Sequence, residues 1–136
     1  MTKLNSYLSL IRFYNPIGFW LLLWPGLWGL FLSDNFNIEN FTIVVLGSFL
    51  TRSLGCAIND FLDKDFDKSV ERTKNRPIAS KELSLSEAGI FIILLATVCI
   101  FLLMQTNPYT IKLVSYVAIP MIILYPLMKR FLAMPQ

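Results

Sequence analysis

The sequence has no histidine among its 136 residues, and it has two cysteines, Cys56 and Cys99. The lack of histidine removes the most common general base and the most common metal-binding side chain. Two cysteines are too few for a four-cysteine zinc site or a disulfide framework. Charged residues are also scarce, at 15% of the chain against 55% hydrophobic residues. This apolar composition excludes an ordinary soluble domain and indicates a membrane protein.

The apolar residues are gathered into long runs that are nearly free of charge. A helix needs about 20 mostly apolar residues to cross the hydrocarbon core of a bilayer. The chain also lacks the alternating segments of about ten residues that are typical of membrane β-barrels. We therefore predict an all-α integral membrane protein with four transmembrane helices, over residues 15–33, 40–59, 86–106 and 111–128.

Three local patterns refine this prediction. Residues 4–14 are predicted to form a short interfacial helix. Ser84-Leu85-Ser86-Glu87 is a capping-box pattern that predicts the start of the third span. A stripe of tryptophans in the first span favours packing or lipid contact over the wall of a prenyl groove. Its members are Trp20, Trp24 and Trp28.

The distribution of lysine and arginine predicts the orientation of the spans. Both ends of the chain and the segment 59–83 carry these residues, whereas the other two connections carry none apart from Lys112 at the edge of one. Because positively charged loops stay in the cytoplasm, we expect both termini and the segment 59–83 on the cytoplasmic side of a bacterial inner membrane. The net charge is +3, but the bases flank apolar spans, so we predict a lipid bilayer and no nucleic acid as partner.

The most polar segment runs from Asp60 to Arg76, with five acidic and five basic residues among 17. If the second span continues as a helix past the membrane surface, Asn59, Asp63 and Asp67 share one face, and Asp60 lies in the same sector. Mg²⁺ prefers such oxygen ligands and binds through one or two carboxylates plus the phosphates of a substrate. The spacing therefore indicates a candidate magnesium–phosphate site.

Basic residues follow the acidic pattern at once and are candidates for holding phosphate oxygens. They are Arg72, Lys74 and Arg76. Competing interpretations exist. An EF-hand fails because Lys68 and Lys74 stand where its loop requires glycine and glutamate. A polybasic lipid-binding patch is weakened by the interleaved acids, whereas the spacing alone leaves a solvated loop of mixed charge open.

Arg52 places a charge inside the second predicted span, where charges are costly and usually functional. It precedes Asn59 by seven residues, so it shares that face at about 10 Å greater depth. One hypothesis is that Arg52 holds the carboxylate of an aromatic acid. The alternative is that it pairs with helix carbonyls or extends toward the membrane interface.

Several segments together resemble a known family. They are RSLGCAIND at 52–60, RTKNRP at 72–77 with Asp63 and Asp67 between them, NPIGFWLLLWPGLWGL at 15–30 and YPLMKRFLAMPQ at 125–136. This combination is similar to the UbiA family of intramembrane prenyltransferases, in particular to its branch that uses 4-hydroxybenzoate in ubiquinone biosynthesis. The resemblance covers essentially the whole chain, and it favours a functional site over a solvated loop.

The resemblance implies Mg²⁺-dependent transfer of a polyprenyl group from polyprenyl diphosphate to 4-hydroxybenzoate. The residues that it implies as catalytic are Asp60, Asp63 and Asp67, which with Asn59 would bind Mg²⁺. The residues that it implies or suggests for substrate binding are Asn59, Arg72, Lys74, Arg76 and Arg52.

The sequence departs from the family in one respect. UbiA proteins carry a second Asp-rich motif on a later helix, whereas no Asp or Glu follows Glu87 here. We therefore expect a truncated chain that holds the N-terminal half of a UbiA-type bundle. A second chain carrying the missing helices is one possible partner. The alternative is a non-catalytic membrane fragment that at most binds Mg²⁺–diphosphate.

Overall fold

The computed structural model describes residues 2–34, 36–121 and 124, and every regular element among them is a helix. The chain divides into two compact units, residues 1–100 and 101–136. The helices that begin in the first unit are α1 (Lys3–Leu10), α2 (Ile17–Leu32), α3 (Ile38–Leu62), α4 (Lys64–Asp67) and α5 (Leu85–Met104). The second unit holds the end of α5, α6 (Pro108–Leu113) and the π-helical segment η1 (Val114–Ala118).

Two of these helices are long and apolar enough to cross a membrane. They are α3, with 25 residues, and α5, with 20. Helix α2 is also apolar, but it has 16 residues. The fourth predicted span starts in α6, and its residues 122–123 and 125–128 lie outside the described residues. The described chain therefore confirms a helical protein with two candidate membrane spans and a shorter apolar helix beside them.

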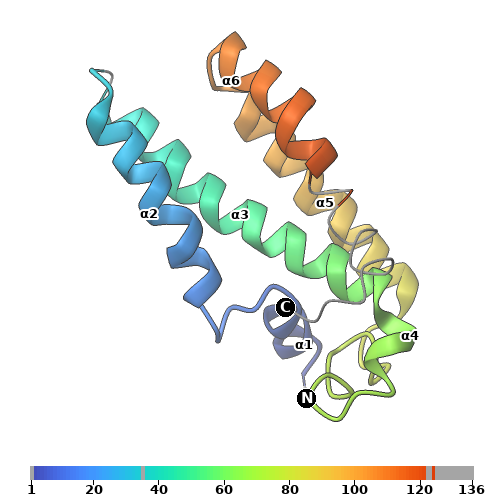
Figure 1. The fold of residues 1–136 in the computed structure, drawn as a ribbon. Helices are drawn as coiled ribbons and strands as arrows, with labels where there is room; N and C mark the ends of the chain where they lie inside the picture. The colour runs from blue at the N-terminus through green and yellow to red at the C-terminus, as the bar shows by residue number, and fades with distance from the viewer. Residues whose placement is uncertain (1, 35, 122–123, 125–136) are drawn as a thin grey trace. The chain divides into compact units, whose positions relative to one another are not determined.

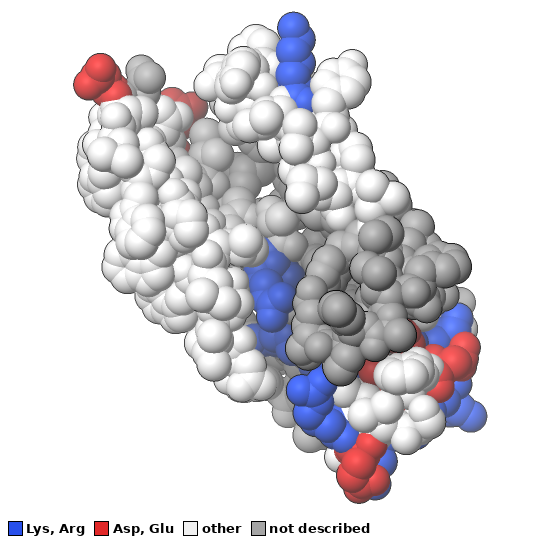
Figure 2. Space-filling model, viewed as in Figure 1, with Lys and Arg blue, Asp and Glu red and all other residues white. Residues whose placement is uncertain are grey.

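Helices α2 and α3 lie side by side (Figure 1). The buried residues of α2 recur every three or four positions, as expected for one packed face of a helix. They are Leu23, Leu27 and Leu30. The three tryptophans of α2 are between 47% and 63% exposed, which agrees with the lipid-contact interpretation of that stripe. Figure 2 shows that the surface over α2 is almost free of charge.

The core of the first unit forms where four segments that are distant in sequence meet. These are α1, the end of α3, the segment 68–84 and the start of α5. Their buried apolar residues form one cluster, made of Leu10, Ala57, Ile78, Leu83 and Ala88. A helix of eight residues, such as α1, is marginal by itself in water, so this packing is what stabilises it.

Polar contacts fasten α1 to the segment before α5. The hydroxyl of buried Ser6 donates a hydrogen bond of 2.7 Å to Oε2 of Glu82, and Lys3 pairs with Glu87. The predicted capping box is confirmed, because the N–H of Ser84 donates to Oε2 of Glu87 at 2.9 Å and the N–H of Glu87 donates to Oγ of Ser84 at 3.2 Å. Glu87 therefore begins α5 and anchors α1.

The predicted interfacial helix over 4–14 is shorter than expected, because α1 ends at Leu10. Arg12 then adopts a left-handed backbone conformation, with φ of 58°. This conformation is disfavoured for residues other than glycine, so surrounding contacts must stabilise it. One such contact joins the Arg12 side chain to Asp60 of the candidate site.

Candidate functional site

The acidic residues of the predicted site lie at the end of α3 and in α4. As predicted, α3 continues past Asn59, and its last residue is Leu62. The backbone bends at Asp63, yet the hydrogen bonds from Asp63 N–H to Asn59 O (2.9 Å) and from Asp67 N–H to Asp63 O (2.8 Å) preserve helical spacing through the bend. Asp60 and Asp67, seven residues apart, therefore share a face.

Both of these carboxylates are buried, and one guanidinium joins them. Asp60 is 1% exposed and Asp67 is 4% exposed. The Nη1 atom of Arg76 lies 3.0 Å from Oδ1 of Asp60 and 2.7 Å from Oδ2 of Asp67. Because a single nitrogen reaches both side chains, the two carboxylates converge on one point. Burial of two acids requires such paired partners.

Arg12 contributes a second guanidinium to the same place. Its Nη2 atom lies 2.8 Å from Oδ1 and 3.1 Å from Oδ2 of Asp60. We call Arg12, Asp60, Asp67 and Arg76 the charge cluster. In the sequence, Arg12 serves only as one of the N-terminal positive charges that predict the membrane orientation, and its contact with Asp60 was not predicted. The one feature of the sequence that could have indicated such a contact is the isolated position of this arginine, directly before the first apolar run.

The segment after α4 folds back so that Arg76 can reach the cluster. Backbone hydrogen bonds from Thr73 N–H to Val70 O (3.0 Å) and from Arg76 N–H to Thr73 O (2.9 Å) form consecutive turns. The hydroxyl of Thr73, which is buried, donates to the backbone oxygen of Asp67 at 3.2 Å. The RTKNRP motif thus folds back toward Asp67 through hydrogen-bonded turns. The contact of Thr73 was also not predicted from the sequence.

The other candidates of this segment lie outside the charge cluster. Lys74 is exposed and pairs with Glu71 at 2.6 Å. Arg72 is exposed, and it makes no ion pair with an acid in the described part of the chain. Asp65 is also exposed, and its hydrogen bond to Lys68 lowers the pKa of its carboxyl group. The partly buried side chains of Asn59 and Asp63 lie near the bend between α3 and α4.

The charge cluster fits a divalent cation that brings phosphate ligands of its own. No group of three or more Asp, Glu, Cys or His side chains capable of holding a metal ion is present among the described residues. Asp60 and Asp67 nevertheless direct two hard oxygen ligands at one point, which a positive charge of Arg76 already occupies. Mg²⁺ is commonly held by one or two carboxylates together with substrate phosphates. This donor set therefore suits Mg²⁺–diphosphate better than a free ion.

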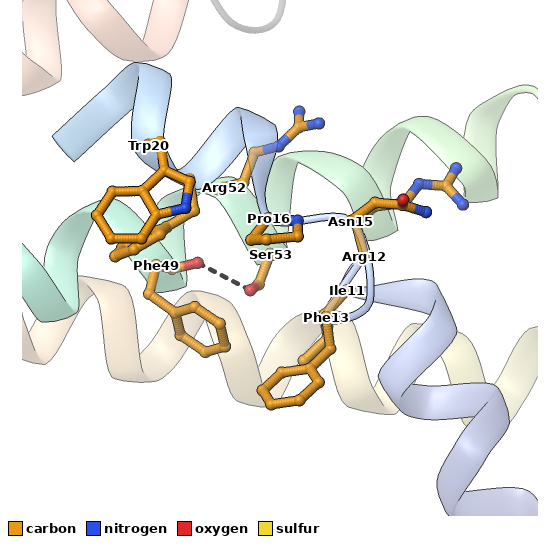
Figure 3. A pocket seen from close by; sticks show the side chains of 10 residues that line it. Ile11, Arg12, Phe13, Asn15, Pro16, Trp20, Phe49, Arg52 and Ser53 are labelled. Atoms are coloured by element: carbon orange, nitrogen blue, oxygen red, sulfur yellow. Dashed lines mark hydrogen bonds between the residues drawn. The ribbon is translucent and has the colours of Figure 1, made fainter. Parts of the chain in front are cut away.

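Arg52 lies on α3, eight residues before Asp60, and lines a pocket of about 270 Å³ (Figure 3). Aromatic side chains dominate the pocket wall, which also includes Asn15. They are Phe13, Phe19, Trp20 and Phe49. The hydroxyl of Ser53, beside Arg52, is engaged with the backbone oxygen of Phe49 at 2.8 Å (Figure 3).

Arg52 itself has no acidic partner. All nine acidic side chains of the sequence belong to described residues, and none of them forms an ion pair with Arg52. Its Nε atom is buried and has no hydrogen-bond partner in the described part of the chain. For this atom, the expected alternative of pairing with helix carbonyls is not observed. Arg52 therefore lines an aromatic-walled pocket without an ion-pair partner among the described residues.

Comparisons with known proteins agree with the resemblance. A 4-hydroxybenzoate octaprenyltransferase of Polynucleobacter asymbioticus is 44% identical over 136 residues, which make up 98% of this chain and 47% of the relative. The enzymes of the same name from Polynucleobacter necessarius and Vibrio atlanticus are 48% and 44% identical over 96% and 99% of this chain. The chain spans about half the length of the curated relatives it matches.

No solved structure matches the chain. The profile of the UbiA prenyltransferase family matches residues 22–136, which include Arg52, the acidic pattern and the RTKNRP motif. Since this match extends over most of the sequence, the chain belongs to the UbiA prenyltransferase family.

Proposed function

We propose that the protein takes part in Mg²⁺-dependent transfer of a polyprenyl group from polyprenyl diphosphate to 4-hydroxybenzoate in ubiquinone biosynthesis. Its relatives are named 4-hydroxybenzoate octaprenyltransferases. The observation that carries the proposal is the convergence of Asp60 and Asp67 on one nitrogen of Arg76. In a membrane protein of this family, such buried paired acids support a phosphate site better than a structural salt bridge alone.

The acidic segment is the proposed diphosphate site. Asp60, Asp63 and Asp67, with Asn59, would hold Mg²⁺, which when bound neutralises charge on the departing diphosphate. Arg76 and Arg12 already lie against these carboxylates and would turn toward phosphate oxygens, for which a planar guanidinium is well suited. Exposed Arg72 and Lys74 would attract the diphosphate from the cytoplasmic side.

The proposed chemistry is the one that the resemblance to the family implies. The bond between the allylic carbon and the diphosphate oxygen breaks, and positive charge develops on that carbon. The ring carbon ortho to the phenol of 4-hydroxybenzoate attacks it, and the ring then loses a proton. Fixed cationic side chains beside the leaving group stabilise its growing negative charge. Arg52, about 12 Å deeper along α3 than Asp60, would hold the carboxylate of the acceptor.

The proposal includes a topology in a bacterial inner membrane. Four spans over 15–33, 40–59, 86–106 and 111–128 would form one partial UbiA-type domain, with both termini and the segment 59–83 in the cytoplasm. Helices α3 and α5, which meet the length for spanning, support the second and third of these spans. The polyprenyl tail would lie in the bilayer.

A second candidate function is binding of Mg²⁺–diphosphate without prenyl transfer. It needs no more than the convergence of Asp60 and Asp67 on Arg76, whereas prenyl transfer also needs a site for the aromatic acceptor.

The decisive experiment is prenyl transfer by membranes that contain the protein, with Mg²⁺, a polyprenyl diphosphate and labelled 4-hydroxybenzoate. Substitution Asp67→Asn should lower the rate by about 100-fold or more, as for loss of a group that stabilises transition-state charge. Substitution Asp65→Asn is the matched control in the same short helix and should retain activity. A chelator should abolish transfer. Diphosphate binding without transfer would favour the second candidate, and absence of both would contradict both.

A further inference from the structure

Gly18 of α2 lies against the guanidinium of Arg52. A Cβ atom built at position 18 would overlap Nε and Cζ of Arg52 and would lie 2.6 Å from its Nη2. No side chain other than hydrogen can therefore occupy position 18 while Arg52 keeps this position. The backbone of Gly18 does not require glycine, because no glycine of the described chain has a positive φ. Close approach, not backbone conformation, explains glycine here.

The charge of Arg52 indicates a function for its close contact with Gly18. An isolated cation in an apolar environment is costly unless it is paired and hydrogen bonded. In the described part of the chain, Arg52 has no acidic partner and its buried Nε has no hydrogen-bond partner, whereas Arg12, which lines the same pocket, pairs with Asp60 through Nη2. Within the pocket, Arg52 is therefore the guanidinium left for an anion. A bound carboxylate would supply the missing partner in the geometry that guanidinium groups prefer.

The shape and lining of the pocket define the class of anion. Its volume of about 270 Å³ is slightly below the range of roughly 300–1,000 Å³ typical of small-molecule sites, so it suits a single ring rather than a polyprenyl chain. Phe19 and two residues labelled in Figure 3, Trp20 and Phe49, provide apolar, aromatic surface on which such a ring can pack. A free phosphate would leave these walls unused.

We propose that Gly18 determines acceptor binding, because it keeps Arg52 at the edge of an aromatic pocket that takes one ring with one carboxylate. This inference deepens the proposed function, since the ring would be the acceptor of the prenyl group. Position 18 touches no reacting atom and acts through Arg52, so Gly18 is a positioning residue. Substitution Gly18→Ala should displace the flexible Arg52 side chain and leave the helix packing intact.

The test is equilibrium binding of labelled 4-hydroxybenzoate to the detergent-solubilised protein, without diphosphate and without Mg²⁺. Substitutions Arg52→Ala and Gly18→Ala should each weaken binding by about tenfold or more, as expected for loss of hydrogen bonds to a charged group. Gly29→Ala is the matched control in α2, because a Cβ at position 29 meets nothing within 4 Å. This variant should change the dissociation constant for 4-hydroxybenzoate by less than about twofold.

A double variant separates the proposed role from a general structural effect. If Gly18 acts through Arg52, adding Gly18→Ala to Arg52→Ala should weaken binding no further. Competition with unlabelled benzoate should displace the label, whereas inorganic phosphate should not. Additive losses in the double variant, equal losses in Gly29→Ala, or displacement by phosphate would each overturn the inference.

The result is distinguishable from the fate of the proposed function. Binding that depends on Gly18 and Arg52 supports the acceptor pocket even if the protein transfers no prenyl group. Lack of binding by the wild-type protein overturns the pocket even if transfer is observed. In a transfer assay, Gly18→Ala should raise the KM for the aromatic acid and leave the KM for polyprenyl diphosphate unchanged.

Discussion

Helix α3 carries two charged sites that lie eight residues apart and differ in how their charges are neutralised. At Asp60, two guanidinium groups approach one carboxylate, and Arg76 continues to Asp67. Arg52 lines an aromatic-walled pocket, and its guanidinium has no acidic partner among the described residues. The first site is closed by internal ion pairs, and the second is open.

This difference separates two uses of buried charge. The closed cluster stabilises the fold by joining the turn after α1, helix α3 and the segment after α4, and a ligand must compete with its ion pairs. An unpaired, partly buried cation lowers the stability of the ligand-free protein and gains an ion-pair partner when an anion binds. The two sites should therefore respond to substitution with opposite changes in stability.

The largest expected effect is at the centre of the closed cluster. Substitution Asp60→Asn leaves Arg12 without its acidic partner and leaves Arg76 paired with Asp67 alone. The side chains of Arg12 and Arg76 are 23% and 21% exposed, so we expect a loss of about 2–3 kcal/mol in the free energy of unfolding, below the value for a fully buried pair. Thermal unfolding in detergent, followed by circular dichroism, measures it. An unchanged midpoint would show that the cluster does not stabilise the fold.

A smaller loss is expected at Arg76. Substitution Arg76→Met removes the bridge to Asp67, while Asp60 keeps Arg12, so we expect about 1–2 kcal/mol of destabilisation. The same assay applies, and exposed Arg72→Met serves as the control. Equal destabilisation by the two variants would contradict the distinction between Arg76, which pairs with buried Asp67, and Arg72, which lies on the exposed surface.

At the open site, substitution should change the free energy of unfolding in the opposite direction. Substitution Arg52→Met replaces an unpaired cation by an apolar side chain of similar length, so the ligand-free protein should be unchanged or stabilised by up to about 1 kcal/mol. The midpoint of thermal unfolding without 4-hydroxybenzoate measures this change. A clear loss of stability would mean that Arg52 is a structural residue and would remove the contrast with the charge cluster.

The smallest effect is expected at Lys3, which anchors α1 from an exposed position. Its hydrogen bond and its attraction to Glu87 raise the pKa of Lys3 above the ordinary value of 10.5. The contribution of the pair is therefore fully present between pH 4.5, above which Glu87 is ionised, and pH 10.5, and it is lost as the pH rises through the higher folded-state pKa of Lys3. Midpoints of wild type and Lys3→Met should differ slightly near neutral pH and converge at strongly alkaline pH. A difference that grows with pH would contradict this pairing.

Much of the local structure could be predicted from particular residues. The apolar run over residues 40–59 predicts α3, and Ser84 with Glu87 predicts the start of α5. The pattern of acids predicts that Asp60 and Asp67 share a face, because helical periodicity fixes which residues lie together. The assignment of Mg²⁺ and diphosphate to these residues stays a prediction.

The partners of these acids could not be predicted from local patterns. Arg12 reaches Asp60 across 48 residues of sequence, and it does so because Leu10 and Ser6 dock α1 and the backbone turns at Arg12 itself. Likewise, nothing in the sequence near Gly18 shows that Arg52 will lie against it. Such contacts depend on how helices pack, which local periodicity does not encode.

The sequence by itself determined that the protein is helical and apolar, that Asp60 and Asp67 share a face and that it belongs to the UbiA prenyltransferase family. Hydrophobic periodicity, capping and motif spacing are local properties, so they can be recognised without a fold. The tertiary structure alone decided which charges are neutralised. It brought Arg12 and Arg76 to Asp60 and, within the described part of the chain, left Arg52 without an acidic partner beside Gly18, because burial and pairing arise only when distant segments meet.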